Sequence, residues 1–158
     1  MEPRFAALAA DLSNELRQLN QLVLELAELR QRLPTPPTTV EIRAAGSILR
    51  DFYNGSKRLF VRIASAIDSS VPVGPNWHVE LLSRVAYPIP DVRPAVISDT
   101  LRQRLGDYLR FRHLFRNVYS RELRWDLLRP LVDDPPTVHR ELTGDVRVFA
   151  AFLQSLTA

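Results

Sequence analysis

Leucine and other apolar residues recur at alternating spacings of four and three between Phe5 and Leu33. This spacing places them on one face of an α-helix, and it predicts a single long helix over residues 4–33. A stripe of this length needs a partner helix, in the same chain or in a second copy. Pro34 ends the pattern, and the stretch Thr35-Pro36-Pro37-Thr38 is expected to be a stiff connector.

Five further segments with apolar residues at helical spacing follow the connector. The first starts with the capping-box pair Thr38 and Glu41, and its apolar register continues across Asn54-Gly55. The second follows Asn76 and the third follows Ser98, both residue types that are favoured at helix N-caps. We therefore expect an all-α bundle of four to five principal helices, in one domain spanning residues 1–158. The five segments cover residues 38–67, 77–86, 99–120, 125–131 and 138–153, and the stretch from Pro88 to Pro94 is predicted to be extended.

The composition restricts the cofactors and the location of the protein. The chain has no cysteine, its three histidines are widely spaced, and it has no glycine-rich phosphate loop, so we expect no metal and no cofactor. The first helix is too highly charged for a secretory signal, and no apolar run approaches the ~20 residues of a membrane span. We expect a cytoplasmic protein without a membrane partner. A net charge of +3 permits an anionic partner without requiring one.

The segment expected to form a helix over residues 99–120 changes character along its length. Leu101 and Leu105 begin an apolar stripe. Farther along, the same stripe is continued by Arg112, Arg116 and Tyr119 in place of leucine. Clustered arginines repel one another unless an anion joins them, and phosphate is the obvious anion. The alternative is a solvated face whose arginines interact favourably with the helix C-terminus.

The other sides of this helix carry a second polar group and an apolar face. His113 and Asn117 are four residues apart and therefore neighbours, with Arg110 on the same side. Of these residues, only the histidine can both accept and release a proton near neutral pH. The apolar face, which is expected to be buried, consists of Phe111, Leu114 and Val118.

In this segment the chain resembles the HEPN superfamily, and within it the HepT-like ribonuclease toxins. The family motif is an arginine, a polar residue, a few intervening positions and then His-x-Tyr, all on one helix. Arg112 and His113 match its first two positions, Tyr119 matches the tyrosine, and Asn117 stands where the histidine belongs. The resemblance covers most of residues 5–130, and the other segments that carry it are Asp51-Phe52-Tyr53-Asn54-Gly55, Asn76-Trp77-His78 and Phe111-Arg112-His113.

The resemblance implies a homodimer that cleaves RNA without a metal, with two motif helices lining a basic cleft. Arg112 is then expected to stabilise the charge on the scissile phosphate, with Arg110 and Arg116 as further phosphate contacts. The motif histidine of the family moves the proton. The resemblance also implies a nucleotidyltransferase antitoxin as partner, which adds AMP to the motif tyrosine, here Tyr119.

Asn117 is the departure from the family pattern. Its amide cannot carry a proton, and loss of a general acid or base typically slows a reaction ~10²–10⁴-fold. His113, one turn earlier on the same side, is the candidate replacement. Two alternatives stay open: a catalytically silent HEPN domain that binds RNA or nucleotide, and a helical protein-interaction module.

Residues outside this segment give weaker indications. Asp51 and Tyr53 are candidates to project toward the cleft, where Asp51 is able to pair with one of the arginines; a solvated acid and a tyrosine at the core edge fit equally well. Trp77 is predicted to anchor the core, His78 to cap a helix locally, and His139 to lie on the surface.

Overall fold

The chain forms a bundle of helices. The structure, a computed structural model, describes residues 2–117 and 123–156, apart from the side chains of Arg116 and Asn117. These residues form six α-helices, one π-helical turn and no β-strand, which confirms the predicted all-α class. The elements are α1 (Pro3–Gln31), α2 (Thr39–Ile63), the π-helical turn η1 (Ala64–Asp68), α3 (Trp77–Arg84), α4 (Asp99–Asn117), α5 (Trp125–Asp133) and α6 (Pro135–Ser155).

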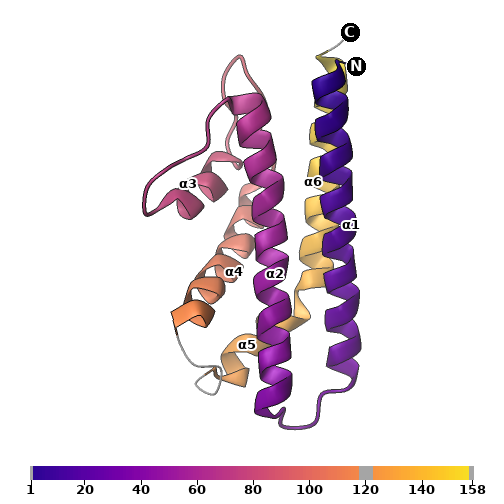
Figure 1. Ribbon diagram of the computed structural model, residues 1–158, viewed down its shortest axis with the longest axis vertical. Coiled ribbons are helices and arrows are strands. Elements are labelled where there is room, and N and C mark those ends of the chain that lie inside the picture. Colours follow the sequence, from indigo (N-terminus) through magenta and orange to yellow (C-terminus); the bar gives the residue numbers. More distant parts are fainter. Residues whose placement is uncertain (1, 118–122, 157–158) are drawn as a thin grey trace.

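Three long helices, α1, α2 and α6, run along the long axis of the molecule (Figure 1). α1 packs against both α2 and α6, so the partner of the long apolar stripe lies within the chain. α4 packs against another side of α2, α3 lies on α2 and α4, and α5 contacts α2 and α6. Within the described residues, no helix is long and apolar enough to cross a membrane.

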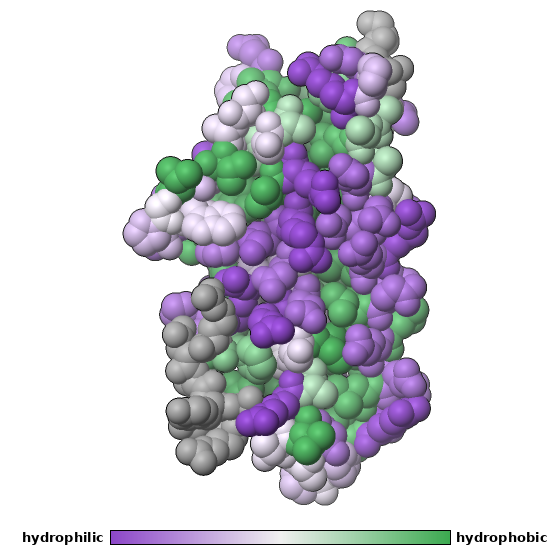
Figure 2. All heavy atoms as spheres, in the orientation of Figure 1, coloured by the Kyte–Doolittle hydropathy of each residue, from purple (hydrophilic) through white to green (hydrophobic). Residues whose placement is uncertain are grey.

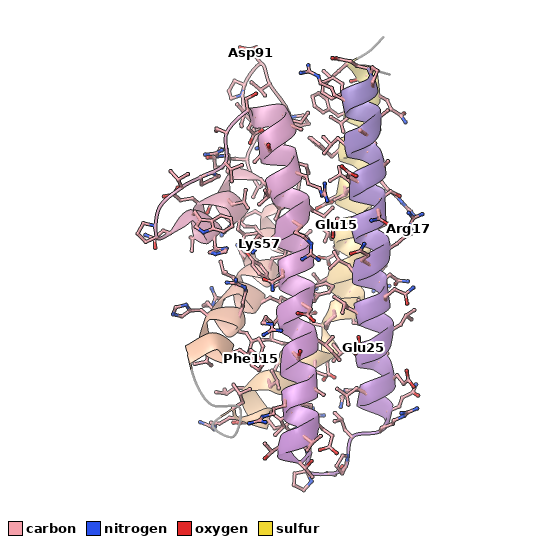
Figure 3. The ribbon with its side chains drawn as sticks, in the orientation of Figure 1. Glu15, Arg17, Glu25, Lys57, Asp91 and Phe115 are labelled. Atoms are coloured by element: carbon pink, nitrogen blue, oxygen red, sulfur yellow. The ribbon has the colours of Figure 1, made fainter. Side chains whose placement is uncertain are left out.

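Ion pairs connect α1 and α2 at the edge of the interface between them. Glu15 on α1 is buried, and its carboxylate pairs with Arg58 (Nε–Oε1 3.3 Å) and Arg62 (Nη2–Oε1 3.6 Å) on α2 (Figure 3). Arg62 also pairs with Asp11 at 3.1 Å. Figure 2 shows hydrophilic side chains gathered over this seam of the two helices.

The predicted caps at the start of α2 and at the start of α4 are present. The backbone N–H of Thr38 donates to Glu41 Oε2 at 2.9 Å, as expected of a capping box. α2 then continues without a break across Asn54-Gly55. Ser98 Oγ accepts from the backbone N–H of Leu101 at 3.1 Å, so the predicted cap of α4 is confirmed. Asn76 precedes α3 but makes no side-chain capping bond.

The connection between α3 and α4 is not the extended stretch that we expected. Ile89 and Arg93 exchange backbone hydrogen bonds of 2.9 and 3.0 Å across a tight turn. The turn brings the buried Arg93 guanidinium onto Asp68, at 2.6 Å (Nε–Oδ1) and 2.9 Å (Nη2–Oδ2). Arg93 also donates to the backbone oxygens of Tyr87 and Arg84. A buried charge that is paired and hydrogen-bonded in this way fixes the end of η1 to the end of α3.

His139 is not the surface residue that the sequence suggested. It is half-buried on α6, and its Nε2 lies 3.0 Å from the backbone oxygen of Leu16 on α1. The prediction failed because the polar segment around it gives no sign that α1 packs over this side of α6.

Two glycines let α2 approach its neighbours closely. A Cβ atom at Gly55 would lie 2.5 Å from Leu19 Cδ2 on α1. A Cβ atom at Gly46 would lie 2.8 Å from the ring of Phe115 on α4. Both positions therefore require glycine for the helices to pack at their present separation.

We expect Gly55→Ala to lower the free energy of unfolding by about 1–3 kcal/mol, because the added methyl group displaces Leu19 in a packed core. Gly144 on α6 is the matched control, since a Cβ there meets no atom within 4 Å. Gly144→Ala should raise the free energy of unfolding by roughly 0.5–1 kcal/mol through helix propensity alone. Urea unfolding measures both. Equal stabilisation by the two substitutions would contradict the close contact at Gly55.

Candidate functional site

The buried apolar stripe of α4 is followed by a charged residue, Arg112. Leu101, Leu105 and Tyr108 are almost completely buried against the bundle. One turn after Tyr108, the half-buried Arg112 donates from Nε to Asn54 Oδ1 on α2 at 2.8 Å. The predicted change from apolar to charged along this helix is therefore found at Arg112, and α2 supplies the group that orients its side chain.

Two phenylalanines secure this part of α4 against α2. Phe111 is buried, and its ring lies 5.8 Å from that of Phe115, between the centroids. Phe115 lies over Gly46, and the guanidinium of Arg50 lies 5.6 Å from the Phe115 ring centroid (Figure 3). Phe111 and Phe115, which precede and follow Arg112 on α4, thus both pack against α2.

The prediction that Leu114 is buried is wrong. Its side chain is 47% exposed, whereas Phe111 is buried as expected. The reason is the rotation of α4: it faces α2 through Tyr108, Phe111, Arg112 and Phe115, which turns Leu114 outward.

Neither of the two α2 candidates, Asp51 and Tyr53, forms an ion pair with a described arginine side chain of α4. Asp51 pairs with Arg50 at 3.5 Å and lines a hollow beside α1. Tyr53 is only 1% exposed and belongs to the core, not to its edge. Burial raises the pKa of Tyr53 well above its usual value, and the Arg112 guanidinium opposes that shift only in part. Tyr53 therefore stays a neutral phenol and cannot act as a base at neutral pH.

The structure describes the side chains of three of the six residues predicted for the site. Arg110 is exposed and forms an ion pair with Asp107 on its own helix, and His113 is exposed one residue after Arg112. Arg116 and Asn117 lie in the last turn of α4, but their side chains are outside the described part of the structure. Tyr119 lies outside the described residues altogether. The structure thus brings Arg110, Arg112 and His113 together and does not test the other three.

These three residues line a groove between α3 and α4 with a volume of about 960 Å³. Arg102 extends the α4 wall, and Trp77 and His78 belong to the α3 wall. None of the described side chains that line the groove is a carboxylate. The described residues also contain no group of three or more side chains that could hold a metal ion. Such a lining favours an anion with both charged and planar parts.

Sequence reasoning did not single out Asn54. Its signals were its place in the Asp51–Gly55 segment that carries the resemblance and its position beside Gly55 inside a helical pattern, where a turn would be the ordinary interpretation. Asn54 and Arg112 are 58 positions apart in the sequence, and no local pattern pairs the two.

We expect Asn54→Ala to lower the free energy of unfolding by about 1.5 kcal/mol, the lower end for a hydrogen bond to a charged group, because Arg112 is only half-buried. Asp51→Ala, one turn earlier on α2, should change it by less than about 0.5 kcal/mol. A double-mutant cycle of Asn54→Ala with Arg112→Ala in urea unfolding isolates the interaction. Additive effects would show that the two side chains do not interact in solution.

Comparison with known proteins identifies the family of the chain. A family model described as HepT-like protein matches residues 44–153, which include most of α2, all of α3, α4 and α5, and most of α6. No curated protein and no solved structure matched the chain. The matched span contains every helix that builds the groove, and it covers more than half of the chain. With its all-helical fold, the chain therefore belongs to the HepT-like family of the HEPN superfamily.

Proposed function

We propose that this HepT-like protein is a metal-independent endoribonuclease and the toxin of a toxin–antitoxin pair that acts in the cytoplasm. The observation that carries the proposal is the placement of Arg112. Its Nε is held by Asn54 at 2.8 Å, and it lines a groove that it shares with His113 and that none of the described carboxylates lines. A positioned guanidinium beside an exposed imidazole is suited to RNA phosphodiester chemistry.

The proposed reaction needs one charge stabilised and one proton moved. The 2′-oxygen of RNA attacks the adjacent phosphorus, the bond from phosphorus to the 5′-oxygen breaks, and the 2′-hydroxyl proton must leave. Arg112 would stabilise the negative charge that grows on the phosphate oxygens. His113 would accept the 2′-hydroxyl proton or supply a proton to the 5′-oxygen as it leaves.

The last turn of α4 favours a second candidate function. Asn117 takes the place of the family histidine, and its amide can bind but cannot transfer a proton. If His113 does not replace that histidine, the same groove serves a catalytically silent HEPN domain that binds RNA or nucleotide.

Exposed leucines support a homodimer. Leu114 on α4 is 47% exposed and Leu127 on α5 is 62% exposed. Both line an apolar hollow of about 460 Å³ between the two helices, which adjoins the α3–α4 groove because Arg110 and Leu114 line both. Apolar side chains gathered in this way favour association, and a two-fold dimer would bring two α4 helices together.

The proposed antitoxin is a nucleotidyltransferase that modifies Tyr119. The Tyr119 oxygen would attack the α-phosphorus of ATP, the bond between the α- and β-phosphates would break, and pyrophosphate would leave with AMP attached to the tyrosine. The added phosphate would lie close in sequence to Arg112 and His113, so it would oppose RNA binding by charge repulsion.

The cleavage proposal is tested with single-stranded RNA in the presence of EDTA. We expect the parent protein to cleave, Arg112→Ala to lower the rate by roughly 10²–10³-fold, and His113→Ala to lower it by roughly 10²–10⁴-fold. The exposed Arg140 on α6 supplies the control, Arg140→Ala, with no change. If His113 replaces the family histidine, Asn117→His should restore cleavage to His113→Ala.

Other results of that assay would support the alternatives. RNA binding without cleavage supports the silent domain. Absence of RNA affinity at low salt, where phosphate contacts are strongest, leaves a protein-interaction module.

The dimer proposal is tested by sedimentation of the parent protein and of Leu114→Glu. We expect the parent to sediment as a dimer and Leu114→Glu as a monomer, because the charge would be buried in an apolar contact. Val148 on α6 is also an exposed apolar residue, and Val148→Glu should remain dimeric. A dimeric Leu114→Glu would place the interface elsewhere.

A further inference from the structure

The two walls of the α3–α4 groove differ in chemistry. The α4 wall carries Arg102, Arg110 and Arg112, and the α3 wall carries Trp77 and His78. At about 960 Å³, the groove is at the upper end of the volumes that hold small organic ligands, roughly 300–1,000 Å³. It is therefore large enough for the base and the backbone of a nucleotide together.

The α3 wall presents two stacked rings. The centroids of the Trp77 and His78 rings are 3.8 Å apart, with 31° between the ring planes. Both residues are half-buried, so the structure holds the pair while leaving part of it open to the groove. The Lys57 ammonium on α2 lies over the Trp77 ring, 5.4 Å from its centroid, and adds a positive charge to this wall (Figure 3). Trp77 packs against the core, as expected, and it also lines the groove.

The α4 wall can take phosphates in spite of its ion pairs. Arg102 pairs with Asp99, and Arg110 pairs with Asp107, each within one turn of α4. Exposed pairs of this kind contribute little to stability. A phosphate chain can therefore compete for both guanidiniums, and neither carboxylate lines the groove.

We propose that this groove binds single-stranded RNA, with an unpaired base stacked on the Trp77–His78 ring pair and the adjoining phosphates on Arg102 and Arg110. The inference rests on the proposed function for the identity of the ligand as RNA. Stacking on side-chain rings requires a base that has left its neighbours, as in a single strand. In duplex RNA the bases are already stacked and the major groove is too narrow for such side chains. The groove would thus select unpaired substrate and hold it next to Arg112 and His113.

The test measures binding apart from cleavage. A 2′-O-methyl RNA strand lacks the attacking hydroxyl, so it reports binding alone. Trp125 is the other tryptophan of the chain, and in a Trp125→Phe protein the indole fluorescence comes from Trp77. We expect the single strand to quench this fluorescence, and the same sequence as a duplex to bind at least tenfold more weakly.

Variants of both walls sharpen the test. Trp77→Leu should weaken binding of a labelled single strand roughly tenfold or more, whereas Trp77→Phe, which keeps a ring, should bind nearly as the parent does. Arg110→Ala should reduce the slope of log affinity against log salt by about one. Arg147→Ala, an exposed arginine on α6, is the matched control and should leave the slope unchanged. Circular dichroism checks that each variant is folded.

The outcomes separate this inference from the proposed function. Cleavage of RNA without Trp77 quenching, and with Trp77→Leu binding as the parent does, overturns the groove inference and leaves the ribonuclease. Quenching by the single strand without cleavage supports the groove inference and removes the ribonuclease. Equal affinity for the duplex, or for a poly-glutamate peptide at the same salt concentration, overturns the groove inference.

Discussion

Close approach of α2 to two other helices is the contact on which the rest of the structure depends. Gly55 meets Leu19 of α1, and Gly46 meets Phe115 of α4, each at a distance that a side chain on the glycine would prevent. Glycine within a helix costs roughly 0.5–1 kcal/mol relative to alanine. The many dispersion contacts of closely packed helices offset that cost. α2 thereby joins the α1–α6 pair to the motif helix α4.

The same helix also orients the candidate site. Asn54 and Gly55 are consecutive, so their positions differ by about 100° around α2. Gly55 admits α1 while Asn54 holds Arg112 of α4. The opposite wall of the groove is fixed independently, because Arg93 binds Asp68 and the backbone at the end of α3. Two separate polar contacts therefore set the two walls between which RNA is proposed to bind.

Two capping predictions, at Thr38 and Ser98, rest on local signals and are confirmed, whereas the predicted Asn76 cap is not formed. The capping box at Thr38 and the cap at Ser98 depend on residues three positions apart, and the structure contains both. The stripe of α4 led to Arg112 because helical periodicity fixes which side chains share a face. The prediction for Leu114 failed since two neighbouring faces of α4 carry apolar residues, and only the packing decides which of them is buried.

The sequence by itself determined the helices, their apolar faces and the arginine-rich end of α4, along with the family to which the chain belongs. Only the tertiary structure paired Arg112 with Asn54 and placed Trp77 and His78 across a groove from Arg110. The physical reason is that a helix repeats every 3.6 residues whatever lies around it. The rotation and separation of two helices instead depend on side chains far apart in the chain, such as Gly46 and Phe115, which no local pattern relates.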